Sequence, residues 1–194
     1  MRALDYPFGI PLRSYALVDG EAVELERAQV DVAERVALLA YGSNAAPEVL
    51  ARKTAAAPDP IPVLRTTLRD FDVVYSAHVS PYGAIPATLA RSPGTEVGAF
   101  IAYLTGQQLD LVSATEPNYD LAHFDHPSCT LERGTAPAEL NVYLSKHGAL
   151  LIDGREVALS EVPAEGRHLR EMTQRQIQER VRATGSLLDR GETP

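Results

Sequence analysis

A short apolar segment that runs into a glycine turn constrains the fold of this chain more than any other stretch. Residues 36–40 read Val-Ala-Leu-Leu-Ala without polar alternation, which predicts a strand buried on both faces. The turn Tyr41–Asn44 follows, and Pro47 with Glu48 behind it indicates the first turn of a helix. The segment is therefore predicted to be a strand, a tight turn and a helix N-terminus, whose unpaired N–H groups can hold a carboxylate or an oxyanion.

The same turn has a simpler interpretation, as a connection in which Ser43 or Asn44 caps the following helix. It lacks the lysine of a phosphate loop and the three glycines of a dinucleotide-binding fingerprint. Ser43 is not predicted to be a nucleophile, because the pattern Gly-x-Ser-x-Gly is absent. A hydroxyl at this turn is therefore expected to bind rather than to attack.

Composition removes several classes of function. The net charge of −8 argues against nucleic acid as a partner. No apolar run has the length of a membrane span, and no long apolar segment follows Arg2 and Asp5, so neither a membrane partner nor a signal peptide is expected. Cys129 is the single cysteine, which excludes an internal disulfide and fits a reducing, cytoplasmic location. The length of 194 residues suits one domain.

Local patterns predict the remaining elements. Asp19-Gly20 and Asp153-Gly154 each lie between apolar runs and indicate hairpins. A short helix is expected from Thr105 or Gly106 to Glu116, because Pro117 disfavours the helical conformation before it. A second helix is expected over residues 167–184, with its arginines on a solvated face. Further strands are expected over residues 63–75, 84–90, 96–104, 130–133 and 140–145, with a turn at 92–95 and loops at 76–83 and around 120–126.

Glu116 is the first candidate for chemistry. It follows the second strongly apolar strand and the short helix, so it is expected at the lip of a core element. A carboxylate that is partly desolvated there can serve as a general base. The alternative is an exposed glutamate at a helix end, since most glutamates are surface residues.

A polar cluster near residues 120–126 is the second candidate, and the pattern His-x-x-His with carboxylates is found in metal sites. The metal interpretation is disfavoured, because no third histidine is near and the segment reads as a loop. A nucleophilic pair of Cys129 with His126 is disfavoured too, since a buried structural cysteine is the usual state. The cluster consists of Asp120, His123, Asp125 and His126.

The string Ala40-Tyr41-Gly42-Ser43-Asn44, followed by Pro47 to Leu50, resembles the Tyr-Gly-Ser-Asn signature of gamma-glutamylcyclotransferase-like proteins. Later landmarks of the family follow in order at residues 87–89, 92–98, 102–105, 116 and 141–143. The resemblance covers residues 36–147, as the core of a single domain 1–194. The N-terminal extension 1–35, with its strands, and the C-terminal hairpin and helix extension 148–194 lie outside it. These extensions are candidates for closing the pocket, restricting substrates or forming a homodimer.

The resemblance implies an α+β fold, a gamma-glutamylcyclotransferase-like mixed β-barrel with flanking helices. It implies a small-molecule γ-glutamyl substrate, which is cyclised to 5-oxoproline with release of the amine, and no metal or organic cofactor. Glu116 is implied as the catalytic acid and base. The substrate-binding residues implied are Tyr41, Gly42, Ser43, Asn44, Ala45, Tyr119 and Tyr143.

The chain departs from the family pattern at two places near the turn and the glutamate. Pro117 stands where the family often has glycine, and Ala46 is a poor helix cap. Two other functions stay open. One is a non-catalytic module that binds a small carboxylate or a peptide end in the same pocket. The other is an interaction protein that works through the arginine-bearing C-terminal helix.

Overall fold

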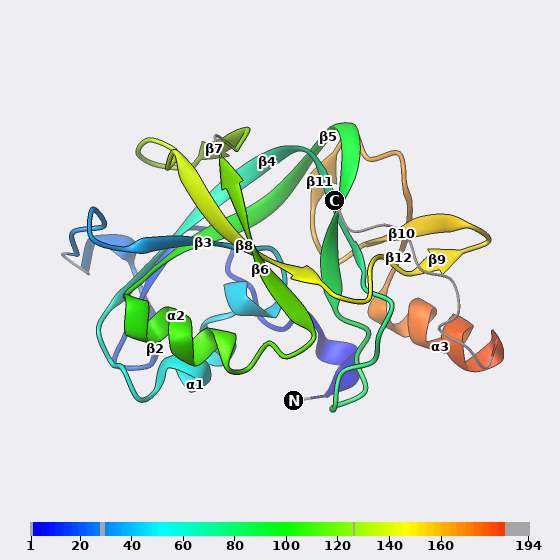
Figure 1. The fold of residues 1–194 in the computed structure, drawn as a ribbon, viewed down its shortest axis with the longest axis horizontal. Helices are drawn as coiled ribbons and strands as arrows, with labels where there is room; N and C mark the ends of the chain where they lie inside the picture. The colour runs from blue at the N-terminus through cyan, green and yellow to red at the C-terminus, as the bar shows by residue number, and fades with distance from the viewer. Residues whose placement is uncertain (1, 28–29, 126, 185–194) are drawn as a thin grey trace.

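The computed structural model describes residues 2–27, 30–125 and 127–184, which form a mixed α+β fold (Figure 1). Over these residues, three α-helices flank a twelve-stranded sheet: α1 (Pro47–Thr54), α2 (Gly106–Ser113) and α3 (Gln174–Thr184). The α+β class predicted from the sequence is confirmed. The strands are β1 (Tyr15–Val18), β2 (Glu21–Val23), β3 (Val36–Ala40), β4 (Ile61–Tyr75), β5 (Ala87–Leu104), β6 (Tyr119–Asp125), β7 (Cys129–Leu131), β8 (Glu139–Ser145), β9 (Leu151–Ile152), β10 (Arg155–Leu159), β11 (Ala164–Glu165) and β12 (Arg170–Met172).

The main path of the sheet has the strand order β12-β10-β4-β5-β3-β8-β6. The β3–β8 and β10–β12 pairs are parallel, and the other neighbours on the path are antiparallel. Among the described residues, no pairing joins β12 to β6 at the two ends of the path. The sheet is therefore mixed, as the sequence led us to expect, but a closed barrel is not shown.

The paired strands β4 and β5 span the molecule, from the side that carries α1, α2 and β3 to the side that carries β9, β10 and α3 (Figure 1). The prediction of a turn at residues 92–95 is wrong, because this segment stays within β5. Pairing resumes on both sides of it, where Arg69 faces Glu96 and Phe71 faces Arg91, so residues 92–95 form a bulge in one continuous strand. The bulge is fixed by the Gly94 N–H, which donates to Asp70 Oδ1 at 2.9 Å.

Strand β3 divides the core into two parts. Leu39 packs in one apolar cluster, and Leu38 and Ala40 pack in a second cluster on the opposite face. Successive side chains of a strand point to opposite faces, so this pattern confirms a strand buried on both sides. The strand ends at Ala40, which delivers the Tyr41–Asn44 turn at the border between the two clusters.

The helices agree in part with the sequence prediction. Helix α1 begins at Pro47, as expected, and Ala46 makes no side-chain cap. Helix α2 begins after Thr105, whose side chain forms a capping box with Gln108. The expected end at Glu116 is wrong, because α2 ends at Ser113. The last turn is tightened, with the Glu116 N–H donating to Ser113 O at 3.0 Å, so Glu116 lies just beyond the helix.

Two other segments differ from their predictions. The loop expected around residues 120–126 is instead the edge strand β6, which pairs antiparallel with β8 over its whole length. The C-terminal helix begins at Gln174 rather than 167, because residues 170–172 form β12 and pair in parallel with β10. Both differences arise from pairing with distant strands, which no local pattern encodes. The end of the C-terminal extension, residues 185–194, lies outside the described residues.

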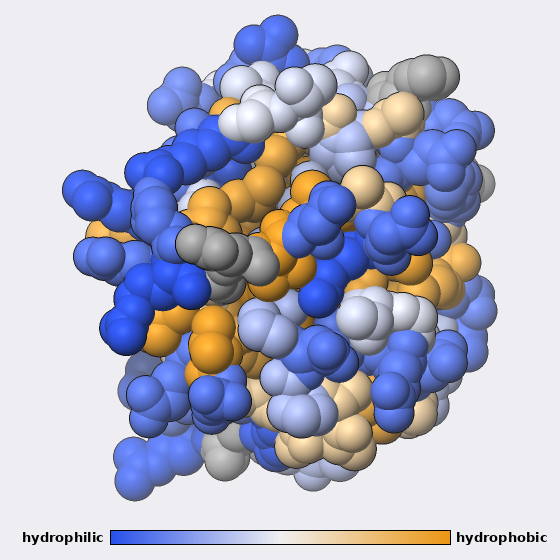
Figure 2. All heavy atoms as spheres, turned by 90° about the vertical axis from the view of Figure 1, so that its left-hand side faces the viewer, coloured by the Kyte–Doolittle hydropathy of each residue, from blue (hydrophilic) through white to orange (hydrophobic). Residues whose placement is uncertain are grey.

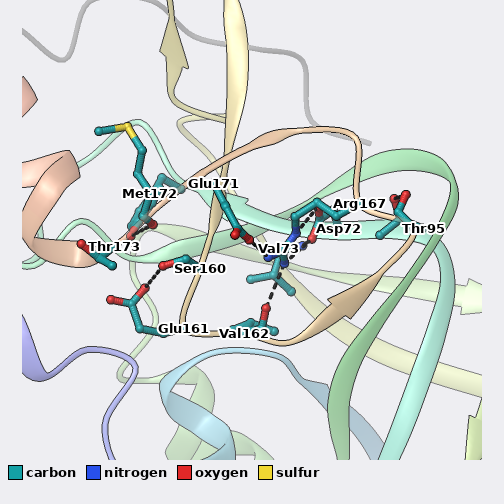
Figure 3. Close-up of polar contacts among 12 residues, drawn as sticks. Asp72, Val73, Thr95, Ser160, Glu161, Val162, Arg167, Glu171, Met172 and Thr173 are labelled. Carbon is teal, nitrogen blue, oxygen red and sulfur yellow. Dashed lines mark hydrogen bonds and ion pairs between the residues drawn. The ribbon is translucent and has the colours of Figure 1, made fainter.

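Arg167 was expected on a solvated helix face, and this is wrong. Its guanidinium forms a bidentate ion pair with Asp72 of β4, and the side chain is only 9% exposed (Figure 3). The same guanidinium donates to Val162 O and to Glu171 (Figure 3). One arginine therefore ties the segment between β10 and β12 to the long strand β4.

The surface on the left-hand side of Figure 1 has an apolar strip at its centre, hollowed between hydrophilic side chains (Figure 2). Most of the rest of this face is hydrophilic (Figure 2). Among the described residues, no helix combines the length and the apolar character needed to cross a membrane.

Candidate functional site

The Tyr41–Asn44 turn and Glu116 line the same cavity, which has a volume of about 430 Å³. The end of β3 and the start of α1 form one wall, and residues 115–119, between α2 and β6, form another. The loop between β4 and β5, Tyr143 of β8 and the N-terminal segment also contribute to the lining. The cavity is therefore assembled from segments that are far apart in the sequence.

Gly42 is required at the turn by close packing. A Cβ atom at this position would lie 2.6 Å from Tyr6 Oη, which is closer than any real contact of that kind. Tyr6 belongs to the N-terminal extension, and its hydroxyl accepts a hydrogen bond from the Ala87 N–H at 2.9 Å. The N-terminal extension thus packs directly on the turn, and it lines the cavity through Tyr6 and Phe8.

The N–H groups of the turn divide into two kinds. The Ala45 N–H donates to Gly42 O at 2.9 Å, and the Ala45 carbonyl accepts from Tyr15 Oη at 2.9 Å. Among the described residues, the N–H groups of Ser43 and Asn44 have no hydrogen-bond acceptor. Ser43 and Asn44 therefore offer main-chain donors to a ligand, whereas Ala45, which does not line the cavity, is already engaged.

Glu116 is hydrogen-bonded directly to Asn44 of the turn in the cavity wall. Its Oε1 accepts from Asn44 Nδ2 at 2.9 Å and from Lys53 Nζ at 2.6 Å. Lys53 also donates to Asn44 Oδ1 at 2.8 Å, which closes a triangle of three side chains. The Glu116 side chain is 13% exposed and the Lys53 side chain 10%, so the ion pair is largely shielded from water. Partial burial of Glu116 agrees with the expectation that this residue is not a freely exposed glutamate.

Lys53 was missed by the sequence analysis. It lies on α1 four residues after Val49 and next to Arg52, and all three line the cavity. Residues spaced by three and four positions share one face of a helix. The helical period was therefore the available signal, but it identifies Lys53 only once the face of α1 that meets the cavity is known.

Five tyrosines surround the carboxylate, at positions 6, 41, 82, 119 and 143. Burial raises the pKa of all five hydroxyls, and the negative charge of Glu116 raises each of them further. All five are therefore protonated and can donate hydrogen bonds at neutral pH. Tyr119 Oη donates to Ala87 O at 2.9 Å, Tyr41 Oη donates to Tyr143 O, and Tyr143 Oη shares a hydrogen with Ser113 at 2.6 Å.

His78 adds an uncharged ring to the lining. Burial, followed by the neighbouring His147, lowers its pKa to about 4 from 6.5. The ring stacks on His147 with centroids 4.7 Å apart and meets the Tyr119 ring at 5.6 Å. His78 is therefore neutral at pH 7 and serves as a polar wall of the cavity.

The structure thus brings together all but one of the residues for which the sequence implied a role. Ala45 is the exception, and the additional lining residues Tyr6, Lys53, His78 and Tyr82 were not identified from the sequence. The residues that gather at the cavity as implied are Tyr41, Gly42, Ser43, Asn44, Glu116, Tyr119 and Tyr143.

The polar cluster considered for metal lies elsewhere, on the surface of β6 and β8. His123 Nε2 is 3.3 Å from Asp125 and 3.6 Å from Glu139, and all three side chains are exposed. Asp120 is 3.6 Å from Lys146, and His126 lies outside the described residues. Exposed acidic groups are common on protein surfaces without a metal, so this arrangement alone does not define a metal site. Burial raises the pKa of the Cys129 thiol, which disfavours the thiolate that a nucleophile needs.

Comparisons with known proteins give structural neighbours alone. No family model matches the chain, and no curated protein sequence matches it. A protein of Arabidopsis thaliana solved in solution is 19% identical, with a TM-score of 0.46, over 61% of this chain and 74% of its own. A gamma-glutamyl cyclotransferase is 20% identical, with a TM-score of 0.43, over 59% of this chain and 68% of its own.

An uncharacterized protein of Homo sapiens is 18% identical, with a TM-score of 0.43, and is matched over 82% of this chain and 93% of its own. A protein of the family named from the sequence motif is thus among the structural neighbours. Identities of 20% and below transfer neither activity nor substrate, so function has to be inferred from the cavity itself.

Proposed function

We propose that this chain is a gamma-glutamylcyclotransferase-like enzyme, which converts a γ-glutamyl amine or peptide into 5-oxoproline and a free amine. The observation that carries the proposal is the placement of Glu116 against Asn44 of the turn, 2.9 Å apart, on one cavity of about 430 Å³. A single small molecule in this cavity would contact both the carboxylate and the main-chain donors.

The reaction begins with the α-amine of the substrate. The neutral amine nitrogen attacks the γ-carbonyl carbon of the same glutamyl group, and Glu116 takes the proton that this nitrogen loses as the new C–N bond forms. Because the attack is intramolecular, holding the substrate in a folded conformation supplies part of the rate.

The tetrahedral intermediate carries a negative charge on the former carbonyl oxygen. The free N–H groups of Ser43 and Asn44 are the donors available to stabilise it. Glu116 then returns its proton to the leaving nitrogen, the original amide C–N bond breaks, and 5-oxoproline remains. No step requires a metal or an organic cofactor. The single cysteine remains the basis for proposing that the enzyme works in the cytoplasm.

The test is release of 5-oxoproline from a panel of γ-glutamyl amines and dipeptides. Glu116→Gln should lower kcat/KM at least about hundredfold, because general acid–base catalysis typically contributes 10²–10⁴-fold. Glu96→Gln is the matched control, since Glu96 of β5 pairs with Arg69 of β4 and does not line the cavity. Unchanged turnover in Glu116→Gln would remove the role assigned to this carboxylate.

A non-catalytic binding module is the second candidate, and the Lys53–Glu116 ion pair at 2.6 Å favours it. A carboxylate whose Oε1 already accepts from an ammonium and an amide can act as a fixed binding group without taking part in proton transfer. Tight calorimetric binding of a γ-glutamyl dipeptide, with no turnover across the panel, would support this second candidate over the enzyme.

A further inference from the structure

Lys53 puts a positive charge in the cavity wall that the proposed reaction does not use. Its ammonium carries three hydrogens, of which the structure engages two, one with Glu116 and one with Asn44. The third is available to a ligand in the cavity, which Lys53 lines.

Glu116 has one carboxylate oxygen, Oε2, that is available to accept a hydrogen bond from a ligand. Both bonds that it accepts, from Asn44 and Lys53, go to Oε1. Among the described residues, Oε2 accepts no hydrogen bond, although a carboxylate oxygen can accept two. The pair therefore offers one cationic donor and one anionic acceptor side by side.

Such a pair is complementary to a group that carries both charges on neighbouring atoms. The α-carbon of an amino acid is substituted with an ammonium and a carboxylate, which can bind Glu116 Oε2 and Lys53 Nζ together. A ligand with only a carboxylate would meet Lys53 but be repelled by Glu116, and a ligand with only an ammonium would face the reverse. Charge-assisted hydrogen bonds of this kind are stronger where water is largely excluded, as it is here.

We propose that Lys53 binds the α-carboxylate of the glutamyl group while Glu116 Oε2 binds its α-ammonium, so that the site selects ligands with a free α-amino-acid head. This inference rests on the proposed function and adds to it a residue, Lys53, that recognises the substrate. It also places the α-amine next to the carboxylate that is to deprotonate it. Lys53 is a binding and specificity-determining residue in this scheme, and it takes no proton.

Calorimetric titration with three ligands tests the proposal. The ligands are L-γ-glutamyl-L-alanine, its analogue without the α-carboxylate (4-aminobutanoyl-L-alanine) and its analogue without the α-amine (glutaryl-L-alanine). We expect the wild type to bind the complete dipeptide at least about tenfold more tightly than either analogue, since a hydrogen bond to a charged group contributes about 1.5–3 kcal/mol.

Two variants of Lys53 distinguish a direct bond to the α-carboxylate of the ligand from a role in holding the Glu116 side chain in place. Lys53→Met should weaken binding of the complete dipeptide by about tenfold to a hundredfold, and binding of the analogue without the α-carboxylate by less than about threefold. Lys53→Arg should recover part of the loss, because it retains the charge. Arg69→Met is the control, because it also removes a cation, but one that pairs with Glu96 at 3.0 Å on the surface and does not line the cavity.

The outcomes are separable from those of the proposed function. Discrimination among the three ligands that depends on Lys53, without release of 5-oxoproline, upholds this inference and overturns the enzyme. Release of 5-oxoproline without such discrimination supports the enzyme and overturns this inference. Equal weakening of all three ligands by Lys53→Met, or no binding of the dipeptide by the wild type, overturns the inference. If Lys53→Met fails to fold, the wild type and Lys53→Arg still decide through the same three ligands.

Discussion

The buried ion pair between Asp72 and Arg167 gives a sharp prediction about stability. Asp72 is fully buried and Arg167 is 9% exposed. The guanidinium donates two bonds of 2.9 Å to the Asp72 carboxylate, one of 2.9 Å to Val162 O and one of 2.8 Å to Glu171 (Figure 3). We predict that Arg167→Met and Asp72→Asn each strongly destabilise the fold.

The magnitude follows from what each change leaves behind. In Arg167→Met, the Asp72 carboxylate would stay buried, and within the described part of the chain the Val73 N–H, at 2.8 Å, would be its one remaining donor. The Glu156 carboxyl is close enough to Asp72 that burial, followed by the Asp72 charge, raises its pKa. Without Arg167, the Asp72 charge would therefore lie near another acidic group and would have lost the cation beside it. Removing one partner of a buried pair costs about 3–5 kcal/mol, because the other charge is left uncompensated.

The assay is urea unfolding of the wild type, both single variants and the double variant Asp72→Asn/Arg167→Met. Each single variant should lose about 3–5 kcal/mol of unfolding free energy, and the double variant should lose clearly less than the sum. Arg69→Met is the control, because Arg69 forms a 3.0 Å pair with Glu96 at 58% and 40% exposure, and it should lose less than about 1 kcal/mol. Single-variant losses no larger than that of the control would refute the reasoning.

Two further predictions concern the walls of the cavity. Gly42→Ala should lose about 1–3 kcal/mol of unfolding free energy, because its methyl group would lie 2.6 Å from Tyr6 Oη, and adding Tyr6→Phe should recover part of that loss; additive losses would contradict the clash. His78 has a folded-state pKa of about 4 against 6.5, so below pH 6.5 the unfolded chain binds a proton that the folded chain does not, and stability falls as the pH falls toward 4. The wild type should therefore lose about 1–2 kcal/mol more than His78→Asn between pH 7.5 and pH 5 in urea titrations, and equal losses would contradict the neutral buried ring.

The parts of the fold that were predictable from sequence are those specified by neighbouring residues. The run 36–40 lacks polar residues on either face, and Pro47 sets the start of α1, so the strand, the turn and the helix were all found. Asp19 and Asp153 adopt positive φ, each followed by a glycine, so both hairpins were identified from the turn residues alone. In each case the signal lies within a few residues of the feature.

The parts that were missed depend on partners far away in the sequence. Arg167 reads as a surface cation until β4 brings Asp72 to it. The edge strand β6 reads as a polar loop until β8 pairs with it. Residues 92–95 have the composition of a turn, and only pairing on both sides keeps them within one strand.

The candidate site follows the same division. Glu116 and the turn were found because both belong to one motif resemblance. Lys53 and Tyr6 were not, since the first depends on the orientation of α1 and the second on the path of the N-terminal segment.

The most direct test of the central claim is a crystal structure of the chain with 5-oxoproline. The claim is that Glu116 and the main-chain donors of the turn contact one small molecule. We predict that the ligand lies in the 430 Å³ cavity, within hydrogen-bonding distance of the Glu116 carboxylate and of the N–H groups of Ser43 and Asn44. A ligand bound outside this cavity, or in contact with only one of these two sides, would contradict the claim.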